Sequence, residues 1–257
     1  MEISGLRQIV NFRDLGGYST PEGVVKQGII YRSGGLWQLN EEELRIVQDL
    51  HIHTVLDLRA EREQDCRPDP VIPGAEYVRV SALSDGLGEG IDFSINGIKR
   101  LGAEGEDQLQ KMRAYYAAMP YGNEAIACLF EILLAERLPV VFHCSSGKDR
   151  TGIAAMAVLL ALGVPDGLIL KDYMISGWMR RQELFAALAE NRDVISEHPV
   201  REELLIMREG VASATMLGVL AGIRERYGTY ENYLEREYGL DTQKIKKLRS
   251  ICLNWEY

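Results

Sequence analysis

Short apolar runs and longer amphipathic stretches alternate along the first two thirds of the chain. Four of the short runs are rich in β-branched residues and are bounded by polar residues or glycine, which is the pattern of buried strands. They cover Gly28–Arg32, Thr54–Leu58, Tyr77–Val80 and Pro139–Phe142. Helical patterns lie between them, so the sequence predicts an α/β fold with a mainly parallel central sheet flanked by helices.

Helices are predicted from start signals and from periodicity. Asn40 followed by Glu43 forms a capping-box pattern at the start of one helix. The stretches Gln108–Met119 and Glu124–Arg137 are amphipathic. Gly152–Leu162 is apolar on every side, which is typical of a helix that is buried on all faces.

Beyond Pro165 the pattern is helical to the end of the chain. Gly210, Gly228 and Gly239 mark expected helix ends, so the sequence predicts an all-helical C-terminal part. The loosest segment, Ser84–Glu106, precedes this part and holds six glycines. We expect it to be a long mobile loop, of a length that is often functional.

Composition and charge narrow the class of protein. The chain has 257 residues, with 29 Lys and Arg against 38 Asp and Glu, which gives a net charge of −9. Hydrophobic residues make up 46% of it, and this content excludes a disordered chain. The length allows one or two domains, and because no linker-like stretch stands out, we expect a single domain over residues 1–257. The acidic balance argues against nucleic acid and against an anionic membrane surface as partners.

The cysteines are too sparse for a disulfide framework and form no C-x-x-C pair, which predicts free thiols in a reducing compartment. They are Cys66, Cys128, Cys144 and Cys252. No signal peptide is visible at the N-terminus, so we expect a cytoplasmic location, with leaderless secretion left open. The longest apolar run, Ile153–Val164, is too short to span a bilayer, and stable membrane insertion is not expected.

Residues 139–162 carry the most informative pattern, because a buried strand runs directly into a polar loop and then into the apolar helix. A loop in this position directs consecutive backbone N–H groups to one point at the positive end of a helix dipole. Gly147 allows a tight turn, and Gly152 allows close helix packing. Arg150 offers a planar fork for a phosphate and follows Cys144 by six positions. The segment therefore predicts an anion-binding loop with a cysteine at one end.

Cys144 lies where a thiolate is favoured. The loop N–H groups and Arg150 both stabilise negative charge on its sulfur, and the hydroxyl of Thr151 is placed to donate to it. We therefore expect a thiolate at neutral pH. Beside a phosphate-binding loop, such a thiolate suits covalent catalysis on a phosphoryl group.

Several stretches resemble motifs of one enzyme superfamily. The loop His143–Gly152, HCSSGKDRTG, fits the H-C-x5-R-[ST] signature of the cysteine-based protein tyrosine phosphatases. It is most similar to a narrower branch, the atypical tyrosine and lipid phosphatases of microbes. The NFRDLGG, YRS and DLR-x3-E motifs of that branch match Asn11–Gly17, Tyr31–Ser33 and Asp57–Glu63. Residues 227–249 are similar to its closing helices, so the resemblance covers almost the whole chain.

The resemblance implies a protein-tyrosine phosphatase that needs neither a metal ion nor an organic cofactor. Cys144 would attack phosphorus to form a phosphocysteine intermediate, which water then hydrolyses, and Arg150 would bind the equatorial oxygens. Further phosphate-binding groups would come from the loop residues Ser145, Ser146, Gly147, Lys148 and Asp149. The implied supporting residues are His143, which shapes the loop from behind, Thr151, and the pair Asp57 and Arg59.

The identity of the general acid stays open among three aspartates. The chain has no Trp-Pro-Asp tripeptide, which carries the acid in many tyrosine phosphatases. In the branch with GKDR loops, the proposed acid is the residue before the arginine, here Asp149. A loop aspartate lies within hydrogen-bond reach of the leaving group. Asp57, at a strand end, and Asp85, in the glycine-rich segment, are the alternatives.

The expected substrate is phosphotyrosine, with phosphoserine and phosphothreonine as further candidates. Lys148 adds a second cation to the loop, and such a lysine often accompanies phosphoinositide substrates in this superfamily. A phosphoinositide phosphatase is therefore the main alternative. A rhodanese-like sulfurtransferase fits less well, because its loop lacks this combination of histidine, glycine and Arg-Thr. A non-catalytic phospho-binding module is disfavoured because Cys144 and Arg150 are both present.

The expected partner is thus a phosphorylated protein or a phosphoinositide, and the oligomeric state stays open. Residues 166–226 exceed what a minimal phosphatase domain needs. They either pack around the sheet or form a helical lid over the pocket. A lid would offer apolar side chains that are exposed when it opens, namely Trp178, Met179, Leu184, Phe185 and Leu188.

Overall fold

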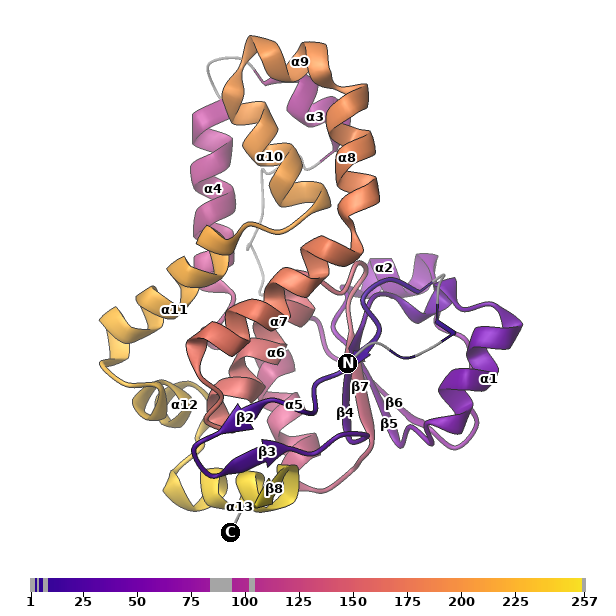
Figure 1. Cartoon of the computed structure of the whole chain (residues 1–257), viewed down its shortest axis with the longest axis vertical. Coiled ribbons are helices and arrows are strands. Elements are labelled where there is room, and N and C mark those ends of the chain that lie inside the picture. Colours follow the sequence, from indigo (N-terminus) through magenta and orange to yellow (C-terminus); the bar gives the residue numbers. More distant parts are fainter. Residues whose placement is uncertain (1–2, 4, 7–8, 84–93, 102–104, 256–257) are drawn as a thin grey trace.

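The computed structural model describes residues 3, 5–6, 9–83, 94–101 and 105–255 (Figure 1). Its central sheet has five strands in the order β1-β4-β7-β5-β6. The last four run parallel, and β1 pairs antiparallel with β4 at one edge. The strands are β1 (Arg13–Asp14), β4 (Ile30–Ser33), β5 (Thr54–Asp57), β6 (Glu76–Arg79) and β7 (Val140–His143). The predicted mainly parallel sheet is confirmed, and each predicted strand overlaps an observed one.

Helices make up most of the remaining described chain. In the N-terminal half they are the short 3-10 turn η1 (Leu36–Gln38), α1 (Glu41–Asp49), α2 (Glu61–Cys66), α3 (Ile95–Arg100), α4 (Gly105–Ala118) and α5 (Glu124–Leu134). After β7 they are α6 (Arg150–Ala161), α7 (Asp166–Met179), α8 (Arg181–Glu190), α9 (Arg192–Glu197), α10 (Pro199–Glu209), α11 (Ser213–Tyr227), α12 (Tyr230–Tyr238) and α13 (Thr242–Cys252). The capping box predicted at Asn40 and Glu43 is present at the start of α1.

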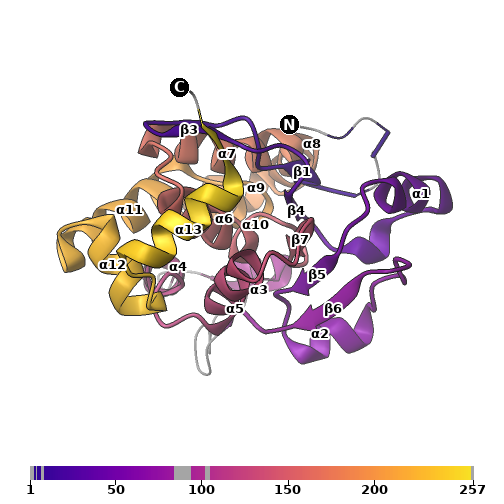
Figure 2. The same ribbon diagram turned by 90° about the horizontal axis from the view of Figure 1, so that it is seen from below.

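Both faces of the sheet are covered, because successive side chains of a strand point to opposite sides. Val140 and Phe142 of β7 lie in the main hydrophobic core. Val141, between them, lies in a second core that includes Tyr31 of β4 and Val47 of α1. The sheet therefore separates α1 from α5 and α6, as Figure 2 shows.

Helix α6 lies in the main core and is the apolar helix that the sequence predicts. Every residue of it after Arg150 is buried. A Cβ atom on Gly152 would lie 3.1 Å from the ring of Tyr173 on α7, so glycine permits the close approach of the two helices. The predicted packing role of Gly152 is thus confirmed.

The C-terminal part divides into two groups of helices. α12 and α13 contact α5 and α6, whereas α8, α9 and α10 stand away from the sheet together with α3 and α4 (Figure 1). Gly210, Gly228 and Gly239 are the C-caps of α10, α11 and α12, as predicted.

The prediction of an all-helical C-terminal part is wrong at its last residues. Leu253–Trp255 forms strand β8, which pairs antiparallel with β3 (Gly23–Val25). β3 also pairs with β2 (Ser19–Thr20), so the three strands form a small second sheet. Three residues are too few to show the period of a strand. Pairing with β3, rather than local sequence, determines this strand.

The predicted long loop Ser84–Glu106 is wrong in its second half. Helix α3 begins after Ser94, whose side chain accepts a hydrogen bond from the N–H of Gly97, and α4 begins at Gly105. Ile98 is buried in the main core, and α3 contacts α10. Tertiary packing therefore stabilises helix in a segment whose glycines disfavour it. Residues 84–93, with Asp85, and residues 102–104 lie outside the described part of the chain.

No single helix in the described ranges is long and apolar enough to cross a membrane. α10 and α11 together have the required length and composition, but they are bent by 79° to each other. Both helices place residues such as Leu205 and Leu220 in the main core.

Candidate active site

The polar loop between β7 and α6 has its carbonyl groups engaged and its N–H groups unengaged. The carbonyl oxygens accept hydrogen bonds from groups behind the loop: Ser145 O from Gly35 N (3.0 Å), Ser146 O from Asn11 Nδ2 (2.6 Å) and Gly147 O from Arg32 Nη2 (2.8 Å). The backbone N–H groups of Ser145–Asp149 donate no hydrogen bond to any residue that the structure describes. Consecutive unengaged N–H groups form the concave donor array that binds anions.

Gly147 is required at the turn of this loop. Its φ of +69° lies in the left-handed region. A Cβ atom there would lie 2.5 Å from both the N of Gly34 and the carbonyl oxygen of Ser33. The loop therefore packs against the end of β4 at a distance that only glycine permits.

Cys144 follows β7 directly and is 1% exposed. Two guanidinium groups, those of Arg32 and Arg150, have favourable electrostatic interactions with it. Burial disfavours the charged form of Arg150, but Cys144 and Glu63 outweigh burial and raise the pKa of this arginine. The hydroxyl of Thr151 is buried and has no hydrogen-bond partner among the described residues, so the expected contact with the Cys144 thiol is not formed here.

Glu63, on α2, binds the guanidinium of Arg150 with both carboxylate oxygens. The distances are 2.6 Å from Nη1 to Oε2 and 3.0 Å from Nη2 to Oε1. The hydroxyl of Ser145 also donates to this carboxylate. Burial alone would raise the pKa of Glu63, but Arg150 outweighs it and lowers the pKa to about 2. The sequence gives Glu63 only as part of a motif, and this role becomes visible when β5 and β7 bring α2 beside the loop.

Asp172, on α7, neutralises two buried arginines behind the loop. It accepts hydrogen bonds from Arg13 Nε at 3.0 Å and from Arg32 Nη1, and from the hydroxyl of Tyr18 at 3.2 Å. Burial opposes its charge, but Arg32 and Arg13 lower the pKa of Asp172 to about 2. Arg32 in turn donates to the carbonyl of Gly147, so α7 is joined to the loop through one side chain. Sequence analysis missed Asp172, because nothing in a uniformly helical stretch marks one aspartate as buried.

Lys148 and Asp149 form a pair within the loop. The Nζ of Lys148 lies 2.7 Å from Oδ2 of Asp149 and donates to the carbonyl of Met207 on α10, also at 2.7 Å. The hydroxyl of Tyr116, on α4, forms a hydrogen bond with Asp149. Lys148 is thus directed at α10, and the side chain of Asp149 stays 21% exposed.

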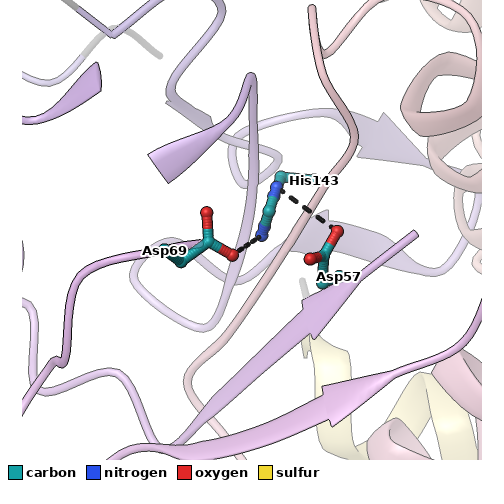
Figure 3. Close-up of side chains that lie close together, drawn as sticks. All are labelled: Asp57, Asp69 and His143. Carbon is teal, nitrogen blue, oxygen red and sulfur yellow. Dashed lines mark ion pairs between the residues drawn. The ribbon is translucent and has the colours of Figure 1, made fainter. Parts of the chain in front are cut away.

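Asp57, Asp69 and His143 lie close together, and His143 directly precedes Cys144 in the chain (Figure 3). Nε2 of His143 is 3.0 Å from Asp69 Oδ2, and its Nδ1 is 3.9 Å from Asp57 Oδ1. One ligand atom from each of the three lies within 4.8 Å of the others, a spacing that would suit a metal ion. The Nη2 of Arg59, however, already binds Asp57 at 2.7 Å and Asp69 at 3.0 Å. The donor set therefore fits an ion-pair network better than a metal site.

The candidate acids occupy different positions. Asp149 lies in the loop, between Cys144 and Arg150 in sequence, and is partly exposed. Asp57 is 2% exposed, and both of its carboxylate oxygens accept hydrogen bonds from Arg59. Asp85 lies outside the described residues.

Comparison with known proteins identifies relatives along almost the full chain. The sequence profile of the Tyrosine phosphatase family matches residues 4–254. A protein of Cupriavidus necator, named as a tyrosine-protein phosphatase, is 31% identical over 241 residues, 93% of this chain and 85% of that protein. The triple specificity protein phosphatase PtpB of Mycobacterium tuberculosis is 28% identical over 280 residues, 98% of this chain and 100% of that protein. A tyrosine-protein phosphatase of Nostoc commune is 27% identical over 233 residues, 85% and 72% of the two chains. These matches confirm the resemblance that the motifs indicate.

Proposed function

Because the chain belongs to the tyrosine phosphatase family, we propose that it hydrolyses phosphotyrosine monoesters through a phosphocysteine intermediate. The observation that carries the proposal is the row of unengaged N–H groups from Ser145 to Asp149, which lies between Cys144 and Arg150. A row of donors at the start of a helix is suited to the oxygens of a phosphoryl group. The thiol at its base supplies the nucleophile.

In the first step the thiolate of Cys144 attacks phosphorus. An S–P bond forms as the bond between phosphorus and the tyrosine oxygen breaks, and Asp149 gives its proton to the leaving oxygen. The phosphoryl oxygens bind the loop N–H groups and Arg150, which stabilise the charge of the transition state. In the second step Asp149 takes a proton from water, the water oxygen attacks phosphorus, and the S–P bond breaks to release inorganic phosphate.

Asp149 is proposed as the general acid because its position fits a proton donor better than that of Asp57. Its carboxylate is partly exposed beside the loop, and Lys148 and Tyr116 fix its orientation. Asp57 is enclosed by Arg59 and is 2% exposed. A proton donor must reach the leaving group directly or through one water molecule.

A phosphoinositide is the second candidate substrate, and Lys148 is the residue that favours it. Its ammonium group belongs to the loop and lies beside Asp149, where an additional phosphate on a substrate ring would be attracted. This use of Lys148 requires release of its hydrogen bond to Met207 and of its ion pair with Asp149. A panel of phosphoinositides, with phosphoserine and phosphothreonine peptides beside it, tests the breadth of the substrate range.

We further propose that α8, α9 and α10 act as a lid over the loop. The hydrogen bond from Lys148 to Met207 joins α10 to the loop, and Arg180 binds Glu209 at 3.0 Å at the base of the helices. Trp178 and Phe185 are 63% and 65% exposed, which leaves apolar surface at this part of the molecule. Hydrogen exchange measured with and without orthovanadate should show altered protection of the α10 amides. Unchanged exchange in a vanadate-saturated protein contradicts the lid.

A reducing compartment, the cytoplasm, is the proposed location. All four cysteines are free, and a nucleophilic thiol must stay reduced to act. Fractionation of cells that make the protein, followed by immunodetection, tests this location.

The decisive experiment measures hydrolysis of an aryl phosphate in excess EDTA. The parent should turn over, Cys144→Ser should fall to the background rate, and Cys128→Ser should keep the parent rate, because this thiol lies on α5, outside the loop. Failure of the folded, reduced parent to hydrolyse any phosphotyrosine substrate overturns the proposal. Full activity of Cys144→Ser would exclude the phosphocysteine intermediate.

A further inference from the structure

The ring of His143, at the end of β7, is fully buried and is surrounded by acceptor oxygens. Its Nε2 lies 3.0 Å from Oδ2 of Asp69, whereas its Nδ1 lies 3.3 Å from the carbonyl oxygen of Cys144 and 3.9 Å from Oδ1 of Asp57 (Figure 3). A neutral imidazole has a hydrogen on one nitrogen and a lone pair on the other. That lone pair would face an oxygen here, so the surroundings suit a ring with hydrogen on both nitrogens.

The charges around the ring also favour the imidazolium form. Arg59 is buried and binds the nearly enclosed carboxylates of Asp57 and Asp69 at 2.7 Å and 3.0 Å. One guanidinium cannot balance two carboxylates, and an unbalanced buried charge is costly, so a positive His143 stabilises the group. Arg79, a further cation near Asp69, is exposed to water, which screens it. Burial raises the pKa of Asp69, but His143 and the two arginines outweigh burial and lower this pKa.

The position of the ring bears on the first peptide of the phosphate loop. In a trans peptide the C=O and the following N–H point in opposite directions. An N–H of His143 that holds the carbonyl of Cys144 therefore turns the N–H of Ser145 away from the ring, towards the phosphate-binding side. The next three carbonyls of the loop are held from behind in the same way. The positive charge of the ring also polarises this peptide, which strengthens Ser145 N–H as a donor.

Asp69 lies in a segment that is restrained and anchored. Pro68 and Pro70 flank it, and their rings fix φ on both sides of the aspartate. The carbonyl of Pro70 accepts a hydrogen bond of 2.6 Å from the hydroxyl of Tyr77 on β6. The carboxylate therefore has a fixed position from which it can orient His143.

We propose that Asp69 is a positioning residue for the phosphatase reaction. It holds His143 in the doubly protonated form, and the ring directs the N–H of Ser145 at the phosphoryl group. The inference rests on the proposed function and adds to it a residue that lies outside the matched motifs. Asp57 does not take this role, because both of its oxygens accept hydrogen bonds from Arg59 and it lies farther from the ring.

Nitrogen-15 NMR of the histidine side chain tests the charge state without any turnover. Substitution of the other three histidines by asparagine, at His51, His53 and His198, leaves His143 as the only histidine signal. At pH 7 both of its ring nitrogens should carry hydrogen. In the same background Asp69→Asn, which keeps the shape of the side chain and removes its charge, should leave hydrogen on one nitrogen only. A single ring hydrogen in the protein that retains Asp69 overturns the proposal, whether or not Asp69→Asn folds.

Kinetics measures the consequence for the loop. In Asp69→Asn we expect kcat/KM for an aryl phosphate to fall about 10- to 100-fold, as when a carboxylate that orients a metal-binding histidine is removed. The loss should be equal for all leaving groups, and affinity for orthovanadate should fall in parallel, because both depend on the loop N–H groups. Glu43→Gln changes a buried carboxylate in the capping box of α1 and is the matched control, which should keep the parent values. Parent-like kinetics in Asp69→Asn, or a loss while His143 stays doubly protonated, overturns the positioning role.

The failure of this inference can be told apart from failure of the proposed function. A folded, reduced parent that hydrolyses no aryl phosphate overturns the proposed function, whereas the NMR result does not depend on turnover. A parent that hydrolyses aryl phosphates but has a single ring hydrogen on His143 overturns the role of Asp69 alone.

Discussion

Glu63 holds the guanidinium of Arg150 through two hydrogen bonds, 2.6 Å and 3.0 Å long. Both terminal nitrogens of the arginine are engaged, and Ser145 joins the same carboxylate. One side chain on α2 therefore orients the arginine that is proposed to bind the phosphoryl group.

Loss of the Glu63 charge should weaken catalysis without unfolding the protein. In Glu63→Gln one of the two strong bonds to Arg150 is replaced by a weaker contact, and the arginine samples other orientations. We expect kcat/KM for an aryl phosphate to fall about 100-fold, the effect of misplacing a group by about 1 Å. Glu61→Gln, at an exposed position of the same helix, is the matched control and should keep the parent value. A parent-like kcat/KM in Glu63→Gln contradicts the orienting role.

The same pair should make the stability of the protein depend on pH in the acid range. The pKa of Glu63 is lowered to about 2 in the folded protein, against about 4.3 in an unfolded chain. Its contribution is therefore fully present above pH about 4.3 and is lost as pH falls towards about 2. We expect the difference in free energy of unfolding between the parent and Glu63→Gln to be constant above pH about 5 and to shrink towards pH 2. A pH-independent difference over this range is inconsistent with the ion pair.

Asp172→Asn should be strongly destabilising, because it leaves Arg13 and Arg32 buried without their counter-charge. Removal of one partner from a buried ion pair costs about 3–5 kcal/mol of unfolding free energy. Asp166→Asn, which removes a carboxylate from the more exposed pair with Arg224, should cost about 1 kcal/mol or less. Denaturant unfolding of both variants checks the contrast. Equal losses in the two variants disagree with the network.

Gly147→Ala should abolish turnover of an aryl phosphate, since the added methyl group meets Ser33 and Gly34. Gly74→Ala is the matched control: its φ of +84° is also left-handed, but nothing lies within 4 Å of the added Cβ. The control should lose only about 1–2 kcal/mol of stability, the cost of a left-handed non-glycine residue, and keep its activity. If Gly147→Ala keeps the activity of the parent, as Gly74→Ala should, the tight packing of the loop against Ser33 and Gly34 is not required for turnover.

The role of Asp149 as general acid predicts a dependence on the leaving group. Asp149→Asn should lower kcat about 100-fold or more for phenyl phosphate, whose leaving oxygen needs a proton. It should have a much smaller effect with an aryl phosphate whose phenol is strongly acidic. Tyr116→Phe, which removes a hydrogen bond to Asp149, should show the same trend more weakly. A uniform loss across leaving groups in Asp149→Asn would assign the residue a structural role instead.

Much of the fold follows from local patterns. The β-branched runs locate β4, β5 and β7, because strands that are buried on both faces need continuous apolar sequence. β6, at the edge of the sheet, is half-exposed and is located by its Tyr and Val residues. The helix ends at glycine are also predictable, because glycine ends a helix through its own backbone freedom. α3 and β8 are not, since each is stabilised by partners distant in the chain: α10 for the first, β3 for the second.

The candidate site shows the same division. Cys144, Arg150 and the loop between them form one contiguous segment, so a single motif reveals them. The residues that fix the loop from outside come from other elements: Arg32 from β4, Glu63 from α2 and Asp172 from α7. As single polar residues they do not stand out from others in the sequence. They acquire their roles because the assembled fold buries them beside groups of opposite charge.

The helices α8, α9 and α10 depart from and rejoin the body at neighbouring points. A Cβ atom on Gly177, near the end of α7, would lie 2.8 Å from Cγ2 of Val211, just after α10. The segment from α8 to α10 is thus topologically an insertion whose two ends lie side by side, and a bridge of a few residues can span the distance between them. Chimeras that exchange residues 180–210 as a cassette would retain Arg32 and Asp172, provided that the new segment restores a carbonyl acceptor for Lys148 and the core side chains of α10. The proposed lid would then be a replaceable module.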